Sequence, residues 1–216
     1  MEKKAQREKR CRGRPQIRSD EETRDMILEA ANDQFVKAGY ASASISTIAQ
    51  MAGVSTKTLY RLFPAKADLF SDVISKKISG YILALDTEGL ATTPLRESLE
   101  KLLISYGRLT LSAETIAMTR LVLSESDRFP EIAAVFYERA IKTTGKAIEN
   151  WLRKRIALDE IELDDPSVAV GMLRGMMAME PQRAVMLGLS ECMSDEDIVA
   201  RARVCTRLFL QGSQKH

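Results

Sequence analysis

Polar side chains that can hydrogen-bond to nucleic acid follow one another closely within residues 44–66. The triplet Thr56-Lys57-Thr58 stands together, and Tyr60 comes two positions later. Hydroxyl and ammonium groups donate to phosphate oxygens, and lysine also donates to guanine in the major groove. A helix that exposes these side chains on one side could therefore enter that groove.

Two short helices joined by a tight turn are predicted to carry these side chains. Small and branched apolar residues recur every three to four positions, as one face of a helix requires: Ile45, Ile48, Ala49 and Ala52. Gly53 can end the first helix, because glycine accepts a left-handed conformation. Ser55 can cap the second by accepting a backbone N–H, and Leu59 and Phe63 would form its buried side. The pattern indicates a helix-turn-helix.

The segment before these helices is strongly basic. Residues 1–18 carry eight Lys or Arg against two Glu, whereas residues 71–216 carry 19 basic and 21 acidic side chains. This distribution favours one surface for a polyanion over a purely solubilising tail. Within it, Arg12-Gly13-Arg14-Pro15 disfavours a helix and resembles the AT-hook core that lies in the minor groove of A/T-rich DNA. Arg12 and Arg14 are therefore expected to contact DNA.

The composition removes most catalytic and metal-site chemistry. His216 is the only histidine, so histidine-based triads and metal sites are not expected, and no cofactor is predicted. Cys11, Cys192 and Cys205 are scattered, which is typical of reduced thiols and favours a cytoplasmic location. No apolar run reaches membrane-spanning length, and residues 1–18 lack the apolar stretch of a secretion signal.

The periodicity predicts an all-α chain with no alternating strand pattern. Helices are expected at about 20–38, 67–86, 95–111, 114–126, 130–156, 166–189 and 195–210. Gly39 should end the first of these, and Gly212 should end the last. Pro130 and Pro166 begin two helices, where a missing N–H costs little, and Pro181 should kink or divide the helix that contains it.

Further positions at fixed spacing extend the helix-turn-helix pattern: Ile27-Leu28, Ala30-Ala31, Phe35, Gly39-Tyr40, Ile48-Ala49, Ala52-Gly53-Val54-Ser55, Thr58-Leu59-Tyr60, Phe63, Lys66 and Leu69. Together they resemble the N-terminal domain of the TetR family of bacterial transcriptional regulators. Ala65 departs from the family pattern, because relatives often place a capping side chain there. Looser motifs later in the chain resemble the AefR-like C-terminal region: Phe129-Pro130-Glu131, Phe136-Tyr137-Glu138, Asp164-Asp165-Pro166, Leu187-Gly188 and Phe209-Leu210-Gln211-Gly212.

The resemblance implies three parts: a basic arm at 1–18, a three-helix DNA-binding domain at 19–66, and a helical effector-binding and dimerisation domain at 67–216. It implies that double-stranded operator DNA is contacted by Arg12, Arg14, Ser44, Thr47, Ser55, Thr56, Lys57, Thr58, Tyr60 and Lys66. Ser44 would cap the first helix of the motif and touch phosphate, with Thr47 near the backbone or a base edge. Tyr60 and Lys66 would hold phosphates.

The second domain is expected to bind an apolar or amphipathic effector and a second subunit. A pocket could be lined by Tyr81, Tyr106, Met118, Phe136, Met172 and Met176, although methionine is also an ordinary core residue. The helices at 166–189 and 195–210 carry small and apolar residues that suit a two-fold four-helix interface. Packing within one chain is the alternative for both helices.

The leading hypothesis is a ligand-responsive, homodimeric repressor that binds a pseudo-palindromic operator. An activator, or a regulator without an effector, would use the same fold. An all-α enzyme that uses the acids of Asp159–Asp165 is a remote alternative, since no histidine, thiolate or phosphate-binding loop accompanies them.

Overall fold

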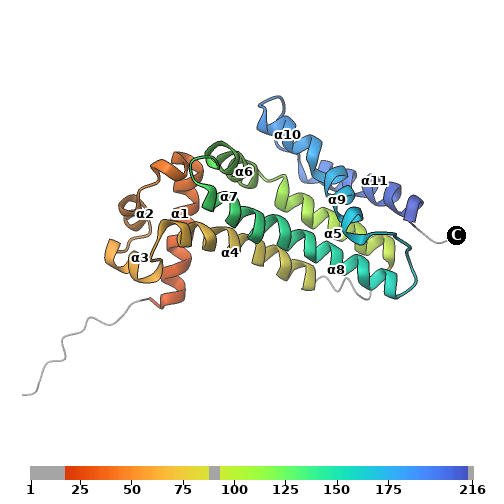
Figure 1. The fold of residues 1–216 in the computed structure, drawn as a ribbon, viewed down its shortest axis with the longest axis horizontal. Helices are drawn as coiled ribbons and strands as arrows, with labels where there is room; N and C mark the ends of the chain where they lie inside the picture. The colour runs from red at the N-terminus through yellow and green to blue at the C-terminus, as the bar shows by residue number, and fades with distance from the viewer. Residues whose placement is uncertain (1–17, 88–92, 214–216) are drawn as a thin grey trace, which may run out of the picture.

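The computed structural model describes residues 18–87 and 93–213, and within these ranges it consists of helices and connecting turns (Figure 1). The α-helices are α1 (Asp20–Ser42), α2 (Ile45–Met51), α3 (Thr56–Leu62), α4 (Lys66–Thr87), α5 (Leu95–Thr110), α6 (Ala113–Glu125), α7 (Pro130–Phe136), α8 (Thr143–Ala157), α9 (Pro166–Arg174), α10 (Glu180–Met186) and α11 (Asp195–Ser213). Two segments are π-helical, η1 (Tyr137–Lys142) and η2 (Gly175–Met179). The prediction of an all-α chain is confirmed for this part of the protein. None of the described helices is both long and apolar enough to cross a bilayer.

The helices α1, α2 and α3 form a small domain with the first half of α4 at one end of the molecule (Figure 1). Its core consists of side chains at most 1% exposed: Ile27, Phe35, Ile48, Leu59, Phe63 and Phe70. The rings of Phe35, Tyr40 and Phe70 contact one another with centroids 5.4–5.6 Å apart. Because α2 and α3 have only seven residues each, their stability depends on this packing.

The first helix begins with a reciprocal cap and is kinked near its end. The Ser19 hydroxyl accepts the Glu22 N–H at 3.1 Å, and the Glu22 carboxylate accepts the Ser19 N–H at 2.8 Å. Gly39 interrupts the helix with φ +83°, a conformation that suits glycine. The chain then completes another short turn to Ser42, so the predicted end near Ala38 marks the kink and not the end of α1.

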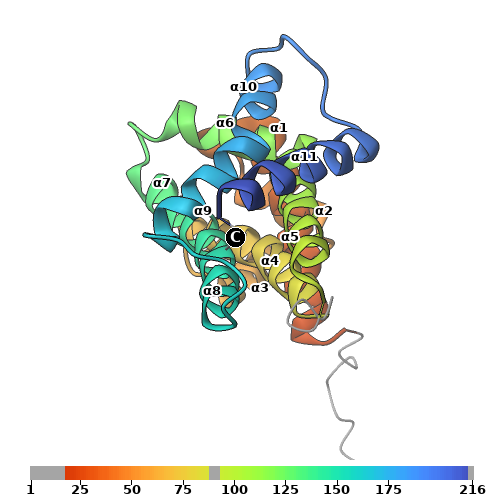
Figure 2. The ribbon, with the colours of Figure 1, turned by 90° about the vertical axis from the view of Figure 1, so that its right-hand side faces the viewer.

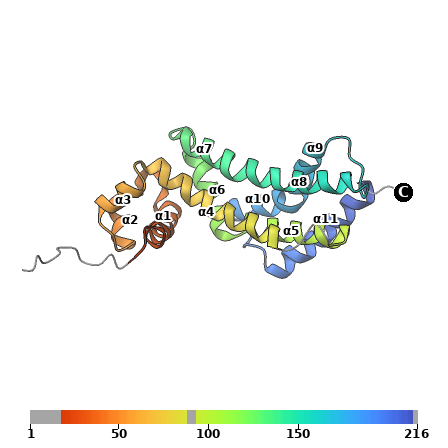
Figure 3. The ribbon, with the colours of Figure 1, turned by 90° about the horizontal axis from the view of Figure 1, so that it is seen from below.

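The fourth helix belongs to both hydrophobic clusters of the protein. Phe70, Ile74 and Ile78 pack in a cluster that joins the N-terminal helices to α6 and α7, whereas Tyr81 packs in the cluster of the remaining bundle. The start of α4 has no capping side chain at Ala65, but the Asp68 carboxylate accepts the Ala65 N–H at 3.1 Å. Because α4 is continuous across the two clusters, the domain boundary at 66/67 stays a prediction (Figure 3).

The second domain is a bundle in which α7, η1 and α8 lie end to end beside α4 (Figure 3). Viewed along the bundle, α4, α5, α8, α9 and α11 surround a shared interior (Figure 2). This interior holds the fully buried side chains of Leu99, Leu103, Ile148, Leu152, Leu173 and Met177. The outer faces of α9, η2 and α11 still expose several large apolar side chains.

Two helices that periodicity predicts are each divided by a π-helical segment, and the division of the second confirms the kink or break expected at Pro181. The predicted helix at 130–156 becomes α7, η1 and α8, and that at 166–189 becomes α9, η2 and α10, which ends at Met186. Pro181 supplies the physical reason for the second division, since it cannot donate to the carbonyl of Met177 four residues earlier. The Arg201 Nε–H donates to that carbonyl at 2.9 Å instead. The prediction that Gly212 ends the last helix is wrong, because α11 continues to Ser213.

Candidate nucleic-acid interface

The turn between α2 and α3 is closed by two backbone hydrogen bonds around Gly53. The Gly53 N–H donates to the Gln50 carbonyl at 3.1 Å, and the Val54 N–H donates to the Ala49 carbonyl at 2.9 Å. This pair is the Schellman arrangement, which needs a left-handed residue at its centre, and Gly53 has φ +65°. Val54 then returns the chain toward the core, so the angle between the two helices is set by local backbone geometry.

The third helix buries one side and presents polar side chains on the other. The Ser55 hydroxyl accepts the Thr58 N–H at 3.1 Å, which is the cap that the sequence predicts. Leu59 is fully buried, whereas Thr56 and Lys57 are exposed and Tyr60 is 53% exposed. Thr58 is half-buried, and its hydroxyl lies 2.9 Å from that of Ser55. Thr56, Lys57 and Tyr60 are thus the side chains that α3 offers to a groove.

At the start of α2, one predicted cap is absent. Ser44 occupies the N-cap position, but its side chain makes no hydrogen bond to the backbone. Its hydroxyl lies 2.9 Å from the Ser46 hydroxyl instead, and both serines are exposed. Thr47 is half-buried on the same turn. The expected capping role of Ser44 is therefore wrong, and its contact with phosphate stays a prediction.

Lys66 joins the end of α1 to the start of α4. Its ammonium donates to the Ala41 carbonyl at 3.2 Å and lies 4.8 Å from the centroid of the Tyr40 ring. Burial lowers the pKa of Lys66 and raises that of the Tyr40 hydroxyl. The phosphate contact predicted for Lys66 would extend from this anchored position. Arg12 and Arg14 lie outside the described residues.

Two arginines hold α3 against the neighbouring helices, and the sequence patterns predict no such role for either. Arg61 pairs in a bidentate manner with Asp20 of α1, at 2.7 and 2.9 Å. Arg24 donates to the Leu62 carbonyl at 3.1 Å and pairs with Asp72 of α4. Helical spacing places Arg61 on the outer face of α3, where it resembles a DNA contact. Its partner lies 41 residues earlier, so no local signal indicates the ion pair.

The Glu125 carboxylate, at the end of α6, accepts hydrogen bonds from the backbone at the kink of α1. The Tyr40 N–H donates to Glu125 Oε1 and the Ala41 N–H donates to Glu125 Oε2, both at 2.8 Å. A Cβ at Gly39 would lie 2.6 Å from Glu125 Oε1 and would displace the carboxylate, and the φ of +83° at this position already favours glycine. We call this arrangement the Glu125 clamp. It ties the last residue of α6 to the N-terminal domain.

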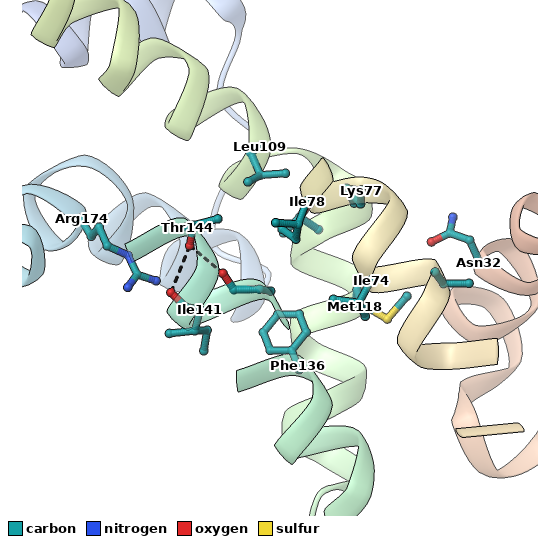
Figure 4. Close-up of a pocket in the computed structure, with 13 residues that line it drawn as sticks. Asn32, Ile74, Lys77, Ile78, Leu109, Met118, Phe136, Ile141, Thr144 and Arg174 are labelled. Carbon is teal, nitrogen blue, oxygen red and sulfur yellow. Dashed lines mark hydrogen bonds between the residues drawn. The ribbon is translucent and has the colours of Figure 1, made fainter. Parts of the chain in front are cut away.

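A largely apolar pocket lies between the two domains (Figure 4). It is lined by Asn32, Val73, Ile74, Lys77, Ile78, Leu109, Thr115, Met118, Phe136, Ala140, Ile141, Thr144 and Arg174.

The structure brings two of the six predicted pocket residues, Met118 and Phe136, together at this pocket. Tyr81 is buried in the second hydrophobic cluster, and Met176 packs against that cluster. Tyr106 lines an adjoining pocket, and Met172 is 60% exposed on α9. Arg174 and Asn32 also line the pocket, and they were not predicted because neither side chain is apolar, aromatic or sulphur-containing.

The acidic segment before α9 makes structural contacts. Glu160 pairs with the buried Arg155 at 2.8 Å. Asp165 caps α9 by accepting the Ser167 N–H at 2.8 Å, and its hydrogen bonds to Ser167 hold the pKa of Asp165 below its ordinary value. In the part of the chain that the structure describes, no three acidic, cysteine or histidine side chains could together hold a metal ion.

Two family models match the chain. Residues 27–73 match that of the bacterial regulatory proteins of the tetR family, and residues 97–212 match that of the C-terminal domain of AefR-like transcriptional repressors. The second match alone covers more than half of the chain, and the first contains α2 and α3.

Individual relatives are more distant. The chain is 33% identical over 79 residues to the HTH-type transcriptional activator FasR of Mycolicibacterium smegmatis, over 37% of this chain and 36% of that protein. It is 26% identical over 153 residues to the HTH-type transcriptional repressor KstR of Rhodococcus jostii, over 65% of this chain and 70% of that one. The match to FasR thus spans little more than a third of that relative's length.

Solved structures of similar fold cover almost the whole chain. A TetR-family transcriptional regulator from Mesorhizobium loti superposes with a TM-score of 0.81 at 23% identity, over 92% of this chain and all of that one. The flavonoid-responsive regulator FrrA superposes with a TM-score of 0.70 at 28% identity, over 90% of this chain and 98% of that one. These likenesses extend through both hydrophobic clusters.

Proposed function

The chain belongs to the TetR family of bacterial transcriptional regulators and is a DNA-binding regulator of transcription, and on that premise we propose that it is a homodimeric repressor released from its operator by a small molecule. α3 would lie in the major groove with Thr56 and Lys57 at base edges, and Tyr60 would contact phosphate. Ser44, Thr47 and Lys66 would contact the backbone nearby, and the arm with Arg12 and Arg14 would follow the adjacent minor groove.

The position of the pocket between the two domains is the observation that carries this proposal. Asn32 lies on α1 of the DNA-binding domain, Ile74 and Ile78 lie on the shared helix α4, and Met118 lies on α6. A molecule in this pocket would touch elements of both domains at once. It would then favour one relative arrangement of them, which is the condition for coupling ligand binding to DNA binding.

An exposed apolar surface supports the homodimer. Its side chains are between 45% and 60% exposed and lie on α9, η2 and α11: Val168, Met172, Met179, Val204 and Leu208. We call this set the α9–α11 face. Contiguous apolar surface on a single chain is typical of an interface with another protein. Pairing of the same face across a two-fold axis would place two reading helices on one operator.

The names of relatives support a repressor and a small effector, but they differ among themselves. KstR is named a repressor and FasR an activator, and FrrA is named flavonoid-responsive. The FadR of Bacillus subtilis, similar in fold at a TM-score of 0.68, was solved with stearoyl-CoA. We propose no enzymatic step, since the acids near α9 already serve Arg155 and the α9 cap.

Selection of genomic DNA fragments, followed by footprinting, tests the proposal. We expect two protected half-sites whose centres are about one helical turn of 10–10.5 base pairs apart, or a multiple of it. The double variant Met172→Glu with Leu208→Glu should sediment as a monomer and lose most of its affinity for the site. Leu158→Glu is a matched control, because Leu158 is 60% exposed at the far end of α8. A monomeric variant that binds as tightly as the parent would contradict the dimer, and a reporter gene activated by the protein would contradict repression.

A further inference from the structure

Most of the pocket wall is hydrocarbon. The shared helix α4 contributes Val73, Ile74 and Ile78, and Met118 and Phe136 face them from α6 and α7 (Figure 4). An occupant would therefore be apolar over most of its length, and the few polar side chains in the wall would determine which end carries a polar group.

Arg174 stands at the end of the pocket formed by η1 and α8, and its guanidinium extends toward Ile141 and Thr144 (Figure 4). Its Nε–H donates to the Tyr106 hydroxyl at 3.1 Å, which fixes the orientation of the group. Gly145 leaves space for it, since a Cβ at that position would lie 3.3 Å from Nη1.

Within the described residues, no carboxylate pairs with Arg174 and its two Nη atoms donate no hydrogen bond. A guanidinium has five N–H donors, so four remain for another acceptor.

The second cation of the pocket wall already has an acidic partner. The Lys77 ammonium lies 2.6 Å from the Glu114 carboxylate. Arg174 is half-buried against apolar side chains and lacks such a partner, which costs free energy that a bound anion would offset. A planar guanidinium with two free Nη groups also matches a carboxylate or phosphate in two parallel hydrogen bonds. Arg174, and not Lys77, is therefore the cation in the pocket wall that is available to a charged group of a ligand.

Both π-helical segments of the described chain lie beside Arg174. η1 supplies Ile141 to the pocket wall, and η2 begins at Gly175, directly after Arg174. π-helical turns are frequent at functional sites, where they redirect side chains. A more open pocket shares Phe136, Ile141 and Arg174 with the apolar one and extends past Thr119 to Gln182. Arg174 thus lies where the apolar pocket joins the more open one.

We propose that the effector of this regulator is an anionic amphipath whose acid group is bound by the Nη atoms of Arg174 and whose apolar body lies against α4, Met118 and Phe136. The proposal rests on the proposed ligand-responsive function and names the chemistry of that ligand. The acid group lies at the junction of the two pockets, and the apolar body points toward Asn32 of α1. Neutral and cationic molecules of the same length would leave Arg174 without a partner.

Calorimetric titration of the purified full-length protein without DNA tests the charge preference. The probes are dodecanoate, dodecan-1-ol and dodecyltrimethylammonium, each below its micelle concentration. We expect dodecanoate to bind at least about tenfold more tightly than the alcohol, as one charge-assisted pair allows, and the cation to bind least. Arg174→Gln should remove the difference between acid and alcohol, and Arg174→Lys should keep part of it. Arg139→Gln is the control, because Arg139 is exposed on η1.

Each outcome bears on the proposal directly. Equal affinity for acid and alcohol, or an acid preference that survives Arg174→Gln, would overturn the anionic class. Failure of all three probes to bind would also overturn it for amphipaths of this length. The proposed repressor is judged separately by its operator binding and dimerisation, which need no ligand, so the two proposals fail in different experiments.

Discussion

Replacement of Glu125 tests how much the Glu125 clamp contributes to the attachment of α6 to the DNA-binding domain. Each carboxylate oxygen accepts one backbone N–H at 2.8 Å, from Tyr40 and from Ala41. Hydrogen bonds to a charged group contribute about 1.5–3 kcal/mol each, and the Ala41 bond is exposed, which favours the lower end. We therefore expect Glu125→Ala to lower the free energy of unfolding by roughly 3 kcal/mol in total, about 1.5 kcal/mol for each bond.

The Glu125→Gln variant keeps the shape of the side chain but removes its negative charge. The amide keeps one acceptor oxygen but turns an NH₂ group toward the second N–H, so one hydrogen bond is lost and an unfavourable contact replaces it. Its effect should approach that of the alanine variant. Asp127→Asn is the matched control, since Asp127 is exposed two positions later and its change should stay within about 0.5 kcal/mol.

Urea denaturation gives the stabilities, and hydrogen exchange gives the local response. The amides of Tyr40 and Ala41 should exchange faster in Glu125→Ala, because they lose their acceptors, whereas amides in the middle of α5 should change only with global stability. If the variant unfolds at the parental urea concentration and these two amides exchange at the parental rate, the clamp carries none of the energy assigned to it.

Three further predictions concern other sites. Lys57→Ala should weaken binding to the selected site by about 1–3 kcal/mol and relax base preference there, and equal losses on matched and mismatched duplexes in anisotropy titrations would contradict base readout. Deletion of residues 1–15 should reduce affinity most where A/T pairs flank the site, so an unchanged ratio between A/T and G/C flanks would exclude a minor-groove arm. Burial raises the pKa of the Cys205 thiol, so less of it is thiolate at pH 8, and mass spectrometry should find iodoacetamide on the exposed Cys192 well before Cys205.

The helix-turn-helix could be predicted because the sequence signals that specify it are local. Periodic apolar residues, a glycine that must be left-handed and a serine that accepts an N–H three residues on all act within a few positions. Gly53 and Ser55 therefore have the geometry that their sequence context requires. Ser44 fails as a cap because Ser46 competes for its hydroxyl, a choice between neighbours that spacing does not decide.

The pocket and the contacts between domains could not be predicted in the same way. Glu125 and Tyr40 are 85 residues apart, and Arg174 and Tyr106 are 68 apart, so no helical period relates them. The π-helical segments also change which side of a helix faces inward. Met172 fails for a different reason, because Ala169, Val170 and Leu173 form the buried side of the regular helix α9 and Met172 lies away from it, exposed.

In the proposed mechanism, the length of α4 would turn a small movement at the pocket into a larger displacement at the DNA-binding end. At about 1.5 Å per residue, its 22 residues form a rod of roughly 33 Å with one end in each hydrophobic cluster. A tilt of about 5° about one end displaces the other by roughly 3 Å. In the proposed dimer, two such rods moving in opposite directions would change the separation of the reading helices by roughly 6 Å, close to the rise of two base pairs at about 3.4 Å each. This small rotation of α4 would then move the two α3 helices out of register with the major grooves, while both DNA-binding domains remain folded.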